Sequence, residues 1–413
     1  MATVRPFRAI RPNKEFADKV ISLPYDVMSR EEAAEMARGN PFSFLRICRS
    51  EIDLPQVEDA YDPAVYEKAK ENIEDFLRKG VFLEEAKPMF YIYKQVMDGN
   101  IQIGLVGCVS VDDYLNDVIK KHEHTRVEKE QDRIRHFDVC NANTEPVFLT
   151  YRDNKKIKML LEGYLQNNAP QYDFTTGDGV QHTLWTVTDD NVISGLSGLF
   201  TEIPCLYIAD GHHRSASACK VGQKRRDEHP GYTGEEEFNY FMAVIFPDSH
   251  LKVFDYNRVV KDLFGNTVRG FLTKVKEAGF RVEEAPTSPY RPEEKHTFGM
   301  YLDGTWYKLT AREEIISSDI VDSLDVAILQ DHLLAPILGI QDPRTDNRID
   351  FIGGIRGLEE LERRVSQDMQ VAFAVHPVDI SDLMEVSDQG KVMPPKSTWF
   401  EPKLGSGLFL HRL

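Results

Sequence analysis

Residues 203–220 constrain the fold more than any other stretch of this chain. They read Ile-Pro-Cys-Leu-Tyr-Ile-Ala-Asp-Gly-His-His-Arg-Ser-Ala-Ser-Ala-Cys-Lys. The apolar run Cys205–Ala209 predicts a buried strand, and a helix of small residues is expected to begin near Arg214 or Ser215. A strand that turns at a glycine into a helix presents backbone N–H groups and the positive end of the helix dipole. The pattern therefore favours an anion-binding turn over an ordinary turn with solvated charges.

The side chains of this turn suit phosphate chemistry. Gly211 lets the backbone approach a phosphate closely, and Arg214 offers a planar fork for its oxygens. We expect Asp210 to hold Mg²⁺ or to accept a proton from an attacking hydroxyl, and His212 and His213 to bind phosphate or transfer a proton. The chain has no GxxxxGKS/T and no GxGxxG pattern, so neither a P-loop nor a Rossmann nucleotide site is predicted.

A second polar cluster, Lys-His-Glu-His-Thr-Arg, occupies residues 121–126. One interpretation is a charged, solvated helix. A cupin metal site is disfavoured because the glycines that bracket such a motif are missing. In the functional interpretation, Glu123 lies in a polar cleft, stays ionised among basic neighbours and acts as a general base. Lys121 is then expected to help bind phosphate. The residues expected to contact the substrate here are His122, His124, Thr125 and Arg133.

Two further segments have weaker signals. Residues 350–354 read Asp-Phe-Ile-Gly-Gly, and the two glycines suit a close approach of the backbone to a ligand. Asp350 is then expected to contact the substrate. The alternative is a simple tight turn. In Leu-Pro-Tyr-Asp (23–26), the proline predicts a rigid turn and Asp26 is expected to cap the next helix.

Strand and helix patterns alternate along the chain, which predicts a mixed α/β (α+β) fold with mixed sheets. Hairpins are expected around residues 98–100 and around Asp303 and Gly304. Residues 241–246 and 252–256 are expected to pair, and residues 259–264 to form a helix. We place an N-terminal region with both polar motifs at 1–256 and a C-terminal region at 257–413; the boundary signal is weak and intertwining stays open.

Composition excludes several classes of function. The chain has 413 residues and a formal net charge of −17, which disfavours binding to nucleic acid or to an anionic membrane surface. No apolar run approaches the roughly 20 residues of a membrane span, and no signal-peptide core is present. Five cysteines without a CxxC pattern predict reduced thiols. We therefore expect a soluble cytoplasmic protein, with homo-oligomer formation left open.

Eight short motifs occur in an order that resembles the prokaryotic family called domain of unknown function 1015. The resemblance runs over nearly the whole chain. The motifs are Leu-Pro-Tyr-Asp (23–26), Asn-Pro (40–41), His-Glu-His-Thr (122–125), Asp-Arg (132–133), Asn-x-x-Pro (143–146), Ala-Asp-Gly-His-His-Arg (209–214), Asp-Phe-Ile-Gly-Gly (350–354) and Pro-Pro-Lys-Ser-Thr (394–398).

The Asp-Gly-His-His-Arg turn and its small-residue helix are also similar to the phosphate-binding element of the ParB/sulfiredoxin-like superfamily. That group includes partition proteins, sulfiredoxins and free-serine kinases. The resemblance implies that the turn grips nucleotide phosphates and that an upstream glutamate, Glu123 by chain order, is the base for a serine hydroxyl. The loop lacks the cysteine of sulfiredoxins, and the acidic composition disfavours a DNA-binding partition protein.

These observations together predict a phosphotransferase, a small-molecule kinase that uses ATP or ADP with Mg²⁺. Its acceptor is expected to be a small hydroxylated metabolite, and the resemblance to free-serine kinases implies free serine as one candidate. One alternative is a metal-dependent hydrolase or phosphoesterase built on His122, Glu123, His124, Asp210 and His213. The other is a non-catalytic nucleotide-binding regulator that uses the same turn.

Overall fold

The computed structural model describes residues 1–413, which divide into two units. Unit 1 comprises Met1–Leu251 and Pro402–Leu413, and unit 2 comprises Lys252–Glu401. The sequence predicts a boundary at 256/257 and leaves intertwining of the two regions open. In the structure, the chain returns to unit 1 at its end, because strand β21 (Leu410–Arg412) pairs with strands of that unit.

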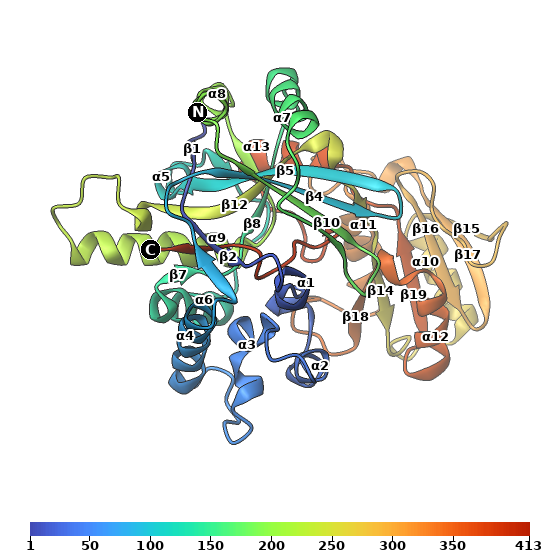
Figure 1. Cartoon of the computed structure of the whole chain (residues 1–413). Coiled ribbons are helices and arrows are strands. Elements are labelled where there is room, and N and C mark those ends of the chain that lie inside the picture. The colour runs from blue at the N-terminus through green and yellow to red at the C-terminus, as the bar shows by residue number, and fades with distance from the viewer. The chain divides into compact units, whose positions relative to one another are not determined.

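Unit 1 is built on a nine-stranded mixed sheet (Figure 1). The order is β6-β11-β8-β12-β5-β4-β10-β9, and β1 pairs with β5. Pairing is antiparallel except between β12 and β8 and between β11 and β6, which are parallel. The bounds are β1 Val4–Arg5, β4 Phe90–Met97, β5 Asn100–Ser110, β6 Ile119–Lys120, β8 Val147–Tyr151, β9 Tyr172–Thr175, β10 Gln181–Val187, β11 Leu206–Asp210 and β12 Tyr240–Pro247.

A smaller four-stranded sheet and the helices complete unit 1. The small sheet runs β3-β2-β21-β7, with β2 at Ala9–Pro12, β3 at Phe82–Glu84 and β7 at Ala142–Asn143. The helices are α1 Ala17–Val20, α2 Arg30–Met36, α3 Leu45–Cys48, α4 Pro63–Arg78, α5 Val111–Leu115, α6 Val127–Cys140, α7 Lys155–Asn167, α8 Asp190–Phe200 and α9 His212–Glu228. Short 3₁₀ turns cover Tyr25–Val27, Ser50–Asp53, Glu237–Asn239 and Asp248–His250.

Unit 2 has its own six-stranded antiparallel sheet in the order β15-β17-β16-β19-β14-β18. Its strands are β14 Tyr256–Val260, β15 Phe280–Glu284, β16 Thr297–Leu302, β17 Thr305–Ala311, β18 Ile349–Gly353 and β19 Val371–Val375, and a separate pair joins β13 Val253–Phe254 to β20 Trp399–Phe400. Its helices are α10 Val268–Glu277, α11 Asp325–Leu329, α12 Glu359–Gln367 and α13 Ile380–Asp388, with a π-helical turn at Gln330–Leu334 and 3₁₀ turns at Glu313–Ile315 and Gly354–Arg356.

The predicted fold class is confirmed, and so are both hairpins: β4 pairs with β5, and β16 pairs with β17. Two local predictions are wrong. Residues 241–246 do not pair with 252–256, because β12 is held between β5 and β8 while β13 pairs with β20. Residues 259–264 were expected to be helical, but Tyr256–Val260 is a central strand of the unit 2 sheet, where β-branched residues such as Val259 and Val260 pack well.

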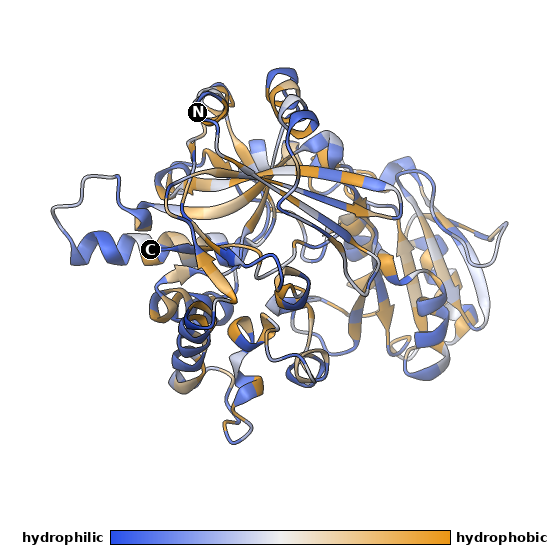
Figure 2. Ribbon diagram, in the orientation of Figure 1, coloured by the Kyte–Doolittle hydropathy of each residue, from blue (hydrophilic) through white to orange (hydrophobic).

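Hydrophobic residues gather on the strands and on the inner faces of the helices, as Figure 2 shows for both units. Leu149, Ile208 and Ala243 lie on the neighbouring strands β8, β11 and β12, and all three belong to the main core of unit 1. Burial of this apolar surface is the dominant favourable contribution to the free energy of folding. None of the helices combines the length and the hydropathy that a membrane crossing requires.

Candidate functional site

The Asp210–Arg214 turn joins β11 directly to α9. Gly211 has a φ of +95°, a left-handed conformation that ends the strand and allows the helix to begin at once. The helix therefore starts at His212, two or three residues earlier than the sequence predicted. The first N–H groups of any helix have no partner within the helix, and at this end no side chain caps them either. The pairing of β11 with β8 shifts register between Ile208 and Asp210, an irregularity of the kind found beside functional sites.

Arg214 points into the protein and is only 2% exposed. Its Nη2 donates to Asp210 Oδ2 at 2.8 Å, and its Nη1 donates to the carbonyl oxygen of Pro146. Burial lowers the pKa of the guanidinium, but nearby carboxylates, Asp210 foremost, more than offset this effect and leave the pKa raised. Arg214 is therefore charged and orients Asp210, and its fork is already engaged within the protein. Its remaining nitrogen, Nε, is buried without a hydrogen-bond partner.

Asp210 lies between two cations. Arg214 is on one side, and Lys403 places its Nζ 3.9 Å from Asp210 Oδ1. Burial would raise the pKa of this carboxyl, but Lys403 and Arg214 outweigh that effect and lower it to about 2. Asp210 is thus an ionised carboxylate with about 30% of its side chain exposed. Sequence analysis missed Lys403, because a lysine near the chain terminus has no local pattern that marks it.

The polar segment 121–126 lies against the start of α9. The His122 N–H donates to His212 Nε2 at 3.4 Å, and the two rings meet edge to face with centroids 4.5 Å apart. The Arg126 N–H donates to His213 Nε2 at 3.0 Å. Burial lowers the pKa of both His212 and His213, so both rings are neutral and accept through Nε2. The two motifs meet because β6 pairs in parallel with β11, and both chains leave the sheet in the same direction.

Within this segment the expected site residues have different surroundings. Glu123 and His124 are exposed beside the buried His122. Lys121 donates to the Tyr114 carbonyl at 3.3 Å and lies over the ring of the same residue, 4.3 Å from its centroid. Its phosphate role therefore stays a prediction. The Thr125 hydroxyl donates to Glu130 Oε2 at 2.8 Å, which anchors the segment to α6.

A buried polar cluster adjoins the turn. Arg133 pairs with Asp132 at 2.9 Å, lies 4.0 Å over the Tyr25 ring and has its Nη1 3.8 Å from Glu145 Oε2. Glu145 Oε1 accepts from the Tyr25 N–H at 3.2 Å and from the Ser406 hydroxyl at 2.8 Å. Burial raises the pKa of Glu145, and the neighbouring arginines only partly oppose this. Arg133 is therefore committed to a buried network, where its substrate role stays a prediction.

Glu145 is the second residue that sequence analysis missed. It precedes Pro146, whose carbonyl accepts from Arg214, so the two residues connect the buried cluster to the turn. The Asn-x-x-Pro motif at 143–146 marked this position, but the pattern does not show that its glutamate is buried.

Asp26 also belongs near the turn, where its negative charge opposes the lowering of the pKa of His213 by burial. The expectation that it caps the next helix is wrong. Ser29 caps α2, and Glu32 completes the capping box.

Asp350 lies in unit 2 on β18, where it is exposed and accepts from Arg364 Nη1 at 2.8 Å. Its local role is this ion pair, and its expected contact with a substrate stays a prediction.

No three histidine, cysteine, aspartate or glutamate side chains in residues 1–413 are placed to share a metal ion. Mg²⁺ needs less from the protein, since one or two carboxylates and the phosphates of a substrate suffice. The ionised Asp210 fits that requirement.

The fold and the site define an α+β protein with a strand–glycine–helix turn that holds an ionised aspartate between two cations. A family model described as "Protein of unknown function (DUF1015)" matches residues 4–327. The chain belongs to this family, as the order of its motifs predicted. No protein with curated annotation matches the chain.

Solved structures with a similar arrangement include a mutant free serine kinase in complex with AMP. It is 14% identical, with a TM-score of 0.39, over 73% of this chain and 91% of the other. A further complex of a mutant free serine kinase contains ADP, with 14% identity, a TM-score of 0.38 and the same coverage. A truncated SbnI from Staphylococcus aureus is 10% identical, with a TM-score of 0.40, over 74% of this chain and 87% of the other.

Proposed function

We propose that this protein is a nucleotide-dependent phosphotransferase that uses ATP or ADP with Mg²⁺ and transfers a phosphoryl group to a small hydroxylated metabolite, with free serine as the first acceptor to test. The observation that carries the proposal is the arrangement of Asp210 between Arg214 and Lys403 at the uncapped start of α9. Phosphoryl transfer depends mainly on positioning and on electrostatic stabilisation, and we expect this turn to supply both.

The phosphates of the nucleotide would lie against the N–H groups of His212 and His213, in line with the ParB/sulfiredoxin-like resemblance of the turn. Lys403, whose Nζ lies 3.9 Å from Asp210 Oδ1, would add a second positive charge beside these phosphates. Asp210 would carry Mg²⁺, and Arg214 would hold the Asp210 carboxylate in place.

The acceptor would lie beside residues 122–125, which are held against α9 by the contacts of His122 and Arg126. Glu123 is the exposed carboxylate of that segment and would accept the hydroxyl proton. A bond then forms between the acceptor oxygen and phosphorus, and the bond from phosphorus to the leaving nucleotide oxygen breaks.

Four of the five cysteines are buried and all are free, which suits a protein of the reducing cytoplasm.

The test is ³¹P NMR of the full chain with ATP or ADP, Mg²⁺ and L-serine. We expect a new phosphomonoester signal with wild type and its loss, by at least 100-fold in rate, with Glu123→Gln. Glu71→Gln, on the exposed face of α4, is the matched control and should react like wild type. Equal turnover by wild type and Glu123→Gln would remove Glu123 from the reaction.

A nucleotide-binding regulator is the second candidate, and one observation favours it. Lys403 and Ser406 tie the C-terminal segment to Asp210 and Glu145, so occupation of the turn could be relayed to that segment. Saturable nucleotide binding without turnover of serine or any other hydroxylated acceptor would favour this reading over the kinase.

A further inference from the structure

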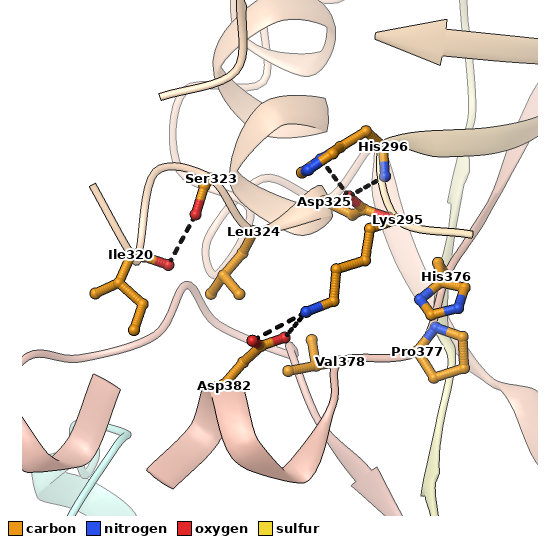
Figure 3. A pocket seen from close by; sticks show the side chains of 10 residues that line it. All are labelled: Lys295, His296, Ile320, Ser323, Leu324, Asp325, His376, Pro377, Val378 and Asp382. Atoms are coloured by element: carbon orange, nitrogen blue, oxygen red, sulfur yellow. Dashed lines mark hydrogen bonds and ion pairs between the residues drawn. The ribbon is translucent and has the colours of Figure 1, made fainter. Parts of the chain in front are cut away.

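Unit 2 contains a cavity of about 170 Å³ that the proposed reaction does not use (Figure 3). Lys295 and His296 line it just before β16, Asp325 lines it from the first turn of α11, and Asp382 lines it from α13. A cavity of about 150 Å³ is large enough for benzene, so this one suits a ligand of about six non-hydrogen atoms.

The cavity wall contains a buried carboxyl group with an unused oxygen. Asp325 is 6% exposed, and its Oδ1 accepts from the His296 N–H at 2.8 Å. Its Oδ2 has no hydrogen-bond partner, and neither has the buried Nδ1 of His376 in the same wall. A buried carboxylate oxygen without a donor is costly, so a ligand that brings N–H groups would bind favourably here.

The charges around the cavity select the sign of the ligand. The Lys295 ammonium is neutralised by Asp382 at 2.7 Å and by Asp379 at 2.9 Å, and Figure 3 shows its side chain reaching toward Asp382. Burial lowers the pKa of His296, which leaves that ring neutral. Two carboxylates around one ammonium already leave one negative charge, and an ionised Asp325 adds another, so a cation is favoured over an anion.

The rest of the wall is mainly apolar, and its one hydroxyl, that of Ser323, donates to the Ile320 carbonyl at 3.3 Å. Ile320, Leu324 and Val378 line the cavity, and Leu324 and Val378 are buried. These side chains suit an alkyl group, which gains by leaving water. Because no metal-ligand set is assembled in the chain, the donor-rich cation that fits is an organic one.

We propose that this cavity binds a small primary alkylammonium ion, with the ammonium donating to Asp325 Oδ2 and the alkyl group packed against Ile320, Leu324 and Val378. His376 Nδ1 is a second acceptor for the same ammonium. The site is independent of the proposed phosphotransfer, since none of its residues belongs to the turn at Asp210.

The test is isothermal titration of the full chain with n-propylammonium chloride at pH 8, with n-propanol as the neutral analogue. We expect saturable binding of the amine, at least tenfold tighter than any binding of the alcohol. Asp325→Asn keeps an oxygen for the His296 N–H and removes the charge, and it should weaken amine binding at least tenfold. Asp331→Asn, an exposed position on the following turn, should bind like wild type.

Val378→Phe provides a second test that leaves Asp325 intact. The larger side chain fills the apolar wall, so n-propylammonium binding should be lost. The proposal is overturned if wild type shows no saturable amine binding, if the alcohol binds equally well, or if Asp325→Asn or Val378→Phe binds the amine as wild type does.

Discussion

Arg214 and Asp210 form an ion pair across the first turn of α9, with Nη2 and Oδ2 2.8 Å apart. The guanidinium is buried and the carboxylate is half-buried, so Arg214 holds Asp210 from within the protein while part of the carboxylate stays accessible to solvent. The expected binding of phosphate by Arg214 stays a prediction, since two of its nitrogens donate to Asp210 and to the Pro146 carbonyl. Arg214 orients the carboxylate, and Lys403 places a second positive charge 3.9 Å from its other oxygen.

Arg214→Ala should lower the free energy of unfolding by about 3 kcal/mol or more, because it leaves Asp210 and the Pro146 carbonyl without their donor. Urea unfolding of both proteins measures the difference. The control is Arg38→Ala, which removes an exposed pair with Glu35 and should cost at most about 1 kcal/mol. Equal losses of unfolding free energy in the two variants would mean that the contacts of Arg214 with Asp210 and Pro146 do not stabilise the fold more than an exposed ion pair does.

Gly211→Ala should destabilise the protein more than Gly234→Ala. Both glycines have φ near +95°, so the backbone penalty, about 1–2 kcal/mol, is shared. At Gly211 the added methyl would also lie 3.1 Å from the Arg214 guanidinium, whereas nothing lies within 4 Å at Gly234. Thermal unfolding compares the two variants. A larger loss for Gly234→Ala would contradict the close packing of Arg214 on the turn.

Asp210 should contribute to stability against acid. Its pKa is lowered to about 2 in the folded protein, below the ordinary value of 3.8, so its contribution is present above pH 4 and is lost as the pH falls toward 2. We expect up to about 2 kcal/mol from this effect. Unfolding free energies of wild type and Asp210→Asn between pH 2 and 6 check it. The difference between the two proteins should shrink as the pH falls, and a constant difference would contradict the assignment.

Asp325 should have the opposite pH dependence. Burial raises its pKa to about 7, so its contribution to stability is complete below pH 4 and is lost as the pH rises through 7. The titratable groups that face it are Lys295, His296, His376 and Asp382. In wild type, the free energy of unfolding should therefore fall by up to about 4 kcal/mol between pH 4 and 8, and Asp325→Asn should remove this fall. If the variant shows the same slope as wild type, another group titrates in this range.

The sequence patterns that predicted the fold well were local ones. Asp98 and Gly99, and likewise Asp303 and Gly304, fix their hairpins, because the positive φ at these positions suits few other residues. The predicted pairing of residues 241–246 with 252–256 was wrong, because a short apolar run can pair with any neighbouring strand and its partner depends on the whole sheet.

The candidate site was predictable only in part. The chemistry of Asp210–Arg214 follows from the adjacent residue types, but the inward direction of Arg214 depends on the carbonyl of Pro146, which is 68 residues away. Lys403 and Glu145 reach the turn through strand pairing and chain return, which no local window contains. The meeting of His122 with His212 likewise depends on the parallel pairing of β6 with β11.

The central claim, that the turn at Asp210 binds nucleotide phosphate with the help of Lys403, is tested most directly by isothermal titration of Mg²⁺-ADP. We predict saturable binding by wild type, at least tenfold weaker binding by Lys403→Met, and wild-type binding by Lys156→Met, which removes an exposed lysine paired with Glu202. Absence of binding by wild type, or equal affinities of wild type and Lys403→Met, would contradict the claim.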